Sequence, residues 1–123
     1  MVQADMPQLT QECNVWRDQL HAFRDEFKLM QQELQKSVNH SLSKKQQESL
    51  EHYQNQLHIQ LINIHDLKQA VKSYDAQLQK QQSSIVDEQL QQHTNLQNDY
   101  LHLSNDLTAL RQELHVFVAG VKN

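Results

Sequence analysis

Apolar residues recur along most of the chain at spacings that alternate between three and four. Such spacing places them on one face of an α-helix, as in the heptad pattern of coiled coils. It predicts a first helix over residues 7–38, with Asp5 as its N-cap and Pro7 tolerated in its first turn. The apolar seam of this helix consists of Leu9, Cys13, Trp16, Leu20, Phe23, Phe27, Met30 and Leu34.

Two further seams follow and predict helices over residues 44–80 and 85–120. The second seam contains one polar member, Gln60, and the third continues upstream to Val86. The second seam is Leu50, Tyr53, Leu57, Gln60, Ile64, Leu67, Val71, Tyr74 and Leu78, and the third is His93, Leu96, Tyr100, Leu103, Leu107, Leu110, Leu114, Phe117 and Val121.

Short polar segments separate the three predicted helices. Ser43 and Gln46 have the spacing of a capping box, in which two side chains bind the free N–H groups of a helix start, and Ser84 and Asp87 repeat this spacing. Gly120 marks the predicted end of the third helix. Because the connections are short, consecutive helices are expected to be antiparallel neighbours.

The predicted fold is therefore all-α, an antiparallel up-down-up three-helix bundle of long coiled-coil helices that forms one domain over residues 1–123. Each helix would be roughly 50–55 Å long at a rise of 1.5 Å per residue. This arrangement, with Trp16 in the first helix, resembles the spectrin-repeat architecture. The resemblance implies the fold alone, and we infer no cytoskeletal role from it.

The bundle's core layers are predicted by counting outward from turns placed near residues 40 and 82. The expected layers are Trp16 with Ile64 and Tyr100, Phe23 with Leu57 and Leu107, and Phe27 with Tyr53 and Leu110. Gln60 would face Leu20 and Leu103. A polar side chain in an apolar layer fixes the register of a coiled coil, so we interpret Gln60 as a register device.

Composition narrows the classes of partner. The 123 residues carry a net charge of −4 and only 11 Lys and Arg, spread along the chain, which argues against nucleic acid as a partner. The sequence begins without the features of a secretion signal, and no apolar run approaches the roughly 20 residues of a membrane span. These features predict no membrane partner and a cytoplasmic location, with which the single Cys13 agrees.

Eight histidines make metal binding the first chemistry to consider. Two ligands on one helix face must be three or four residues apart, and no pair of histidines has this spacing. One motif nevertheless occurs in both the first and third helices and supplies weak metal candidates: Asp18, His21 and Asp25, and Asp99, His102 and Asp106. We weigh a shared metal or ligand site against solvated ion pairs, and we favour ion pairs because His21 and His102 lie outside the seams.

Two further residues lie on the seams themselves. His93 is expected near Val71 and Tyr74, as a histidine hydrogen-bonded near an open end of the bundle, with pH sensing as the alternative. Cys13 is expected to be an inert buried thiol. The sequence contains no arrangement of nucleophile and base and no phosphate-binding loop, so we predict no catalytic residue, no cofactor and no enzyme activity.

The remaining signal is a set of apolar residues outside the seams. Ile59 and Ile62 lie off the second seam, with Ile62 at the outward position, and Leu29 belongs to a second stripe on the first helix with Val15 and Ala22. The competing interpretation is that the bundle is slightly rotated from this heptad frame and buries these side chains itself. We expect a non-catalytic interaction or scaffold module, a homodimer or a partner of another helical protein, in which helix two packs on its symmetry mate or on helix one around these residues. The alternative function is a metal or small-ligand carrier built on the paired Asp-His-Asp motifs.

Overall fold

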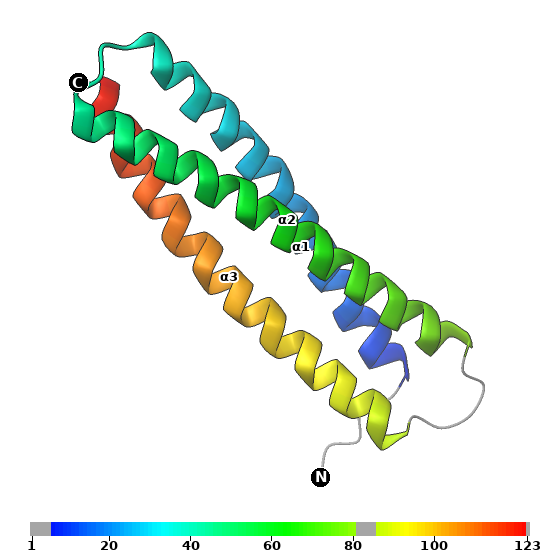
Figure 1. Ribbon diagram of the computed structural model, residues 1–123. Helices are drawn as coiled ribbons and strands as arrows, with labels where there is room; N and C mark the ends of the chain where they lie inside the picture. The colour runs from blue at the N-terminus through cyan, green and yellow to red at the C-terminus, as the bar shows by residue number, and fades with distance from the viewer. Residues whose placement is uncertain (1–5, 81–85, 123) are drawn as a thin grey trace.

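The computed structural model describes residues 6–80 and 86–122, which form three long helices folded side by side (Figure 1). The helices are α1 (Met6–Lys36), α2 (Lys44–Lys80) and α3 (Asp87–Lys122), and a short 3-10 helix, η1 (Ser37–Asn39), follows α1. α1 and α3 run in the same direction and α2 runs in the opposite one (Figure 1). The predicted all-α, up-down-up three-helix bundle is confirmed.

The helix ends differ slightly from the predicted ones. The predicted last residues of the first helix form η1, and α3 begins at Asp87 rather than at residue 85. α3 also continues through Gly120, which does not mark its end. A glycine ends a helix when it adopts a positive φ, and Gly120 has none.

A capping box begins α2, as predicted. The main-chain N–H of Gln46 donates to the Ser43 hydroxyl over 3.1 Å, and the main-chain N–H of Ser43 donates to the Gln46 side chain over 2.9 Å. At the start of α3, the Gln89 side chain accepts a hydrogen bond from the main-chain N–H of Val86 over 3.3 Å. The predicted caps Asp5 and Ser84 lie outside the described residues.

The core follows the three predicted seams. Its buried apolar residues are Leu9, Cys13, Trp16, Leu20, Phe27 and Leu34 on α1, Leu50, Leu57, Ile64, Leu67, Val71, Tyr74 and Leu78 on α2, and Leu96, Tyr100, Leu103, Leu107, Leu110 and Leu114 on α3. Phe23 packs only partly buried against this core. Val86 lies before α3 and is 49% exposed, so it does not extend the third seam as predicted.

One predicted contact between layers of α1 and α3 is confirmed, but the predicted level of α2 beside Trp16 is wrong. Trp16 stacks on Tyr100 with ring centroids 6.3 Å apart, as expected. Next to Trp16, however, Arg17 reaches Asp75, more than one turn beyond the Ile64 that was expected at this level. The connection explains the shift, because its 3-10 residues rise about 2.0 Å each and its extended residues about 3.3 Å, against 1.5 Å in an α-helix.

The same shift changes the setting of Gln60. This side chain is partly buried, and its oxygen accepts a hydrogen bond from the amide of Asn63 over 3.1 Å. The Gln60 oxygen therefore has its partner on α2 itself and needs no group from α1 or α3. The predicted role of Gln60 in fixing the register is not tested by this contact.

α1 and α2 pack most closely together, and α3 is held less tightly against both. Cavities accordingly lie on both sides of α3. One of about 410 Å³ lies between α2 and α3 and one of about 270 Å³ between α1 and α3, and both are open to solvent. The outer faces of the helices therefore border two different grooves beside α3.

Candidate functional site

A buried polar cluster lies where the start of α1, the end of α2 and the start of α3 meet. His93 of α3 is only 6% exposed. Its Nδ1 lies 3.0 Å from the Tyr74 hydroxyl of α2, its Nε2 contacts a carboxylate oxygen of Glu12 of α1, and its ring lies 4.8 Å from that of Trp16. The predicted placement of His93 beside Tyr74 is confirmed.

The hydrogen bonds of this cluster determine which atoms carry protons. The Tyr74 hydroxyl has a single hydrogen, which it donates to the main-chain carbonyl of Gln89 over 3.2 Å. Its bond with His93 therefore requires a hydrogen on Nδ1. The Nε2 atom of the same ring contacts the Glu12 carboxyl group of α1. One imidazole thus joins all three helices.

A second pair of polar residues lies beside this cluster. The guanidinium of Arg17 is 3.6 Å from Oδ2 of Asp75, which is only 8% exposed. Oδ1 of Asp75 has no hydrogen-bond partner among the described residues. A buried carboxylate oxygen without a partner costs stability, so Asp75 is the least well satisfied polar group of this end of the bundle.

Cys13 lies in the same region and is fully buried, as predicted. Burial raises the pKa of its thiol from 9.0 to about 11, and the charge of Asp75 adds to the rise. The thiolate, rather than the thiol, is the nucleophile and the metal ligand. The raised pKa therefore agrees with the predicted inert thiol.

The free energy of unfolding should fall as the pH rises from 9 to 11. The folded state keeps the Cys13 proton where the unfolded chain releases it, so this stabilisation is complete below pH 9 and is lost toward pH 11. A shift of this size corresponds to a change of about 3 kcal/mol. Burial, with the nearby Cys13 and Glu12 charges, also raises the pKa of Tyr74 to about 12 and extends the fall. Urea unfolding at a series of pH values measures this decrease in the free energy of unfolding.

Cys13→Ala is the matched control, because it removes the titrating thiol from the core. Its free energy of unfolding should fall less steeply than that of the unmodified protein between pH 9 and 11. Parallel curves for the two proteins would show that Cys13 does not contribute to the alkaline loss of stability.

The first Asp-His-Asp motif faces α2. Nδ1 of His21 lies 3.5 Å from the ammonium group of Lys68, and its Nε2 lies 3.4 Å from Asp25. A hydrogen bond from Arg24 lowers the pKa of Asp25. His21 and Asp25 thus belong to an exposed network of ion pairs and hydrogen bonds. Asp18, the remaining member of the motif, is exposed.

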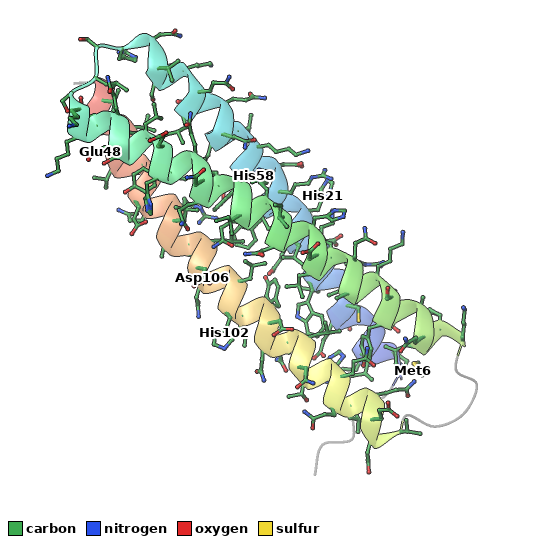
Figure 2. All side chains as sticks on the ribbon, in the orientation of Figure 1. Met6, His21, Glu48, His58, His102 and Asp106 are labelled. Carbon is green, nitrogen blue, oxygen red and sulfur yellow. The ribbon has the colours of Figure 1, made fainter. Side chains whose placement is uncertain are left out.

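The second motif lies in a different groove. Asp99, His102 and Asp106 line the cavity of about 410 Å³ between α2 and α3, together with Asp66. His21 and His102 point from different sides of the bundle (Figure 2). The structure therefore does not bring the two motifs together. Among residues 6–80 and 86–122, no group of three His, Cys, Asp or Glu side chains is arranged to hold a metal ion.

The predicted contact residues are all exposed, but they do not share one face. Leu29 is 62% exposed, and Ile59 and Ile62 are each 47% exposed. Leu29 lies one heptad after Ala22, which lines the cavity between α1 and α3. Ile59 lies one heptad before Asp66, which lines the cavity between α2 and α3. The structure therefore groups Ile59 with Ile62 and places Leu29 beside the other groove.

The sequence did not identify Glu12 as a member of the polar cluster, or Arg17 and Asp75 as the pair beside it. Glu12 and Asp75 are each adjacent to a seam residue, Cys13 and Tyr74 respectively. A charged residue beside a seam is common in coiled coils, where it flanks the core and faces a neighbouring helix. Their position next to His93 depends on the register of all three helices, which the heptads alone do not fix.

Comparison with known protein families, with curated proteins and with solved structures gives no match for this chain. The class of the protein is therefore defined by its own architecture, a three-helix coiled-coil bundle with a polar cluster at one end. Within the described residues, none of the helices combines the length and the apolar character needed to cross a membrane.

Proposed function

We propose that this protein is a non-catalytic helical interaction module that self-associates through the outer face of α2. The observation that carries the proposal is the pair Ile59 and Ile62, each 47% exposed in the middle of that helix. Asn55 and Gln69, one heptad before and after Ile62, are polar. Two isoleucines one turn apart on an otherwise polar face form a localised apolar contact surface.

Burying these isoleucines against another molecule supplies the driving force. Removal of apolar surface from water contributes about 25 cal/mol per Å². A second copy of the chain offers the same surface, and two-fold self-association is the commonest way in which one chain covers such a patch. We therefore propose a homodimer, with another helical protein as the other partner of this face. A cytoplasmic location fits a chain whose single cysteine is a buried free thiol.

The substitution Ile62→Lys tests the proposal. It should dissociate the dimer, because it introduces a charge into the proposed interface, and it should leave helicity unchanged because residue 62 is outside the core. Light scattering measures the mass and circular dichroism the helix content. Leu101→Lys is the matched control, since Leu101 is 50% exposed on α3 and the same charge is introduced away from α2.

The wild-type protein should be a dimer at tens of micromolar, a typical range for weak interfaces. A wild-type monomer at this concentration would contradict self-association. Equal loss of the dimer in both variants would show that the contact surface is not specific to α2.

A further inference from the structure

We propose that two copies pair through α2 in antiparallel orientation, with Ile59 of each copy against Ile62 of the other and Glu51 of each paired with Lys72 of the other. This inference rests on the proposed self-association and specifies its geometry. It follows from the order of residues on the outer face of α2 and from the charges that flank them.

The outer face of α2 carries a second heptad pattern, which we call the outer seam. Its members are all exposed and are spaced alternately by four and three: Glu48, His52, Asn55, Ile59, Ile62, Asp66, Gln69 and Ser73. Such spacing allows a helix to pack lengthwise on another helix. Ile59 and Ile62 are the apolar members of the outer seam and lie next to each other in its middle, so they set the register of the pairing.

Antiparallel pairing places both isoleucines of each copy in the interface. With Ile59 of one copy level with Ile62 of the other, the two-fold axis passes between them, and both isoleucines of each copy form one apolar cluster. The same register places Asn55 level with Asp66 of the second copy, where the amide group can donate to the carboxylate. The polar residues next to the isoleucines are therefore compatible with this pairing.

The charges beside the outer seam are complementary in this register. Glu51 and Lys72 each immediately precede a seam residue, His52 and Ser73, so they occupy the same flanking position near opposite ends of α2. Flanking positions of one type face each other in antiparallel coiled coils and carry the interhelical ion pairs. Glu51 of one copy and Lys72 of the other then differ in height by about half a turn.

Two observations on the single chain support these pairs. Glu51 and Lys72 are both exposed, and neither has an ion-pair partner among residues 6–80 and 86–122. Parallel pairing would instead place Asp66 of each copy against its counterpart, and it would place Glu51 and Lys72 against flanking positions of the other type, so the two ion pairs would be lost.

A charge exchange tests the register. Glu51→Lys and Lys72→Glu should each raise the dissociation constant of the dimer about tenfold, because each places like charges at both ends of the interface. The double variant Glu51→Lys/Lys72→Glu should restore it to within about threefold of the wild type, since the pairs are reformed with opposite polarity. Sedimentation equilibrium at low salt measures all four proteins. Asp18→Lys, an equal change of charge on an exposed position of α1, is the control and should have little effect.

The outcomes separate this inference from the function on which it rests. Dissociation by Ile62→Lys together with a double variant as weak as the single ones would overturn the antiparallel register and leave self-association intact. Single charge variants that bind as tightly as the wild type would also overturn it. A wild-type monomer, or a dimer that Ile62→Lys does not dissociate, would overturn both proposals.

Discussion

Replacing Leu107 with alanine is expected to lower the free energy of unfolding by about 2–5 kcal/mol, the range for a large apolar side chain removed from a packed core. Leu107 has no exposed surface and lies on the seam of α3. The loss combines the transfer free energy of the missing atoms with the cost of the cavity that they leave. Urea unfolding followed by circular dichroism measures it.

Leu101→Ala is the control, because it deletes the same atoms from the same helix at a position that is 50% exposed. Its effect should stay within about 0.5 kcal/mol, as for surface substitutions in general. Phe23→Ala should lower the free energy of unfolding by less than the loss of a fully buried aromatic side chain does. The reason is that Phe23 is only partly buried and borders the cavity between α1 and α3. Equal losses at residues 101 and 107 would contradict the assignment of the core.

The Cys13 thiol is expected to react with a disulfide reagent at least about a hundredfold more slowly in the native protein than in urea, because reactivity follows the thiolate. Its pKa is raised from 9.0 to about 11, so near neutral pH the folded protein contains about a hundredfold less thiolate than the unfolded chain. Its complete burial slows the reaction further, since the reagent reaches sulfur only after local opening. Absorbance of the released thiol measures both rates.

The urea-unfolded protein serves as the internal control, because the chain has one cysteine and the two states differ only in folding. Partial labelling that stops at a fixed fraction would indicate a second native conformation. A native rate close to the unfolded one would show that α1 does not bury Cys13 in solution.

Heptad spacing was sufficient to predict the fold class and most of the core. The seam residues of α1 and α2 that it identified include Leu20, Phe27, Leu57 and Ile64, all fully buried. Such spacing is a property of each helix alone, which is why it can be read without knowing the neighbours. The predicted start of the third helix showed the limit of local signals, since α3 begins at Asp87 and not at residue 85.

The relative heights of the helices were harder to predict. The layer of Trp16 and Tyr100 was correct, but the level of α2 was not, because counting from residue 40 treats every residue of the connection as rising equally. The same limitation hid the pairing of Arg17 with Asp75. Glu12 reaches His93 and Arg17 reaches Asp75 only because three helices meet at one height. The surface prediction was limited in a similar way, as Leu29 faces a different groove from Ile59.

The Glu12–His93 contact also bears on the order in which the chain folds. The two residues are 81 positions apart in the sequence, and both helix connections must be in place before they can meet. Closing a long loop costs conformational entropy that only later contacts recover. α1 and α2, which are consecutive and pack most closely, need only one connection to form their shared interface. The hydrogen bonds around His93 are therefore expected among the last native contacts to form, after α3 has packed on the α1–α2 hairpin.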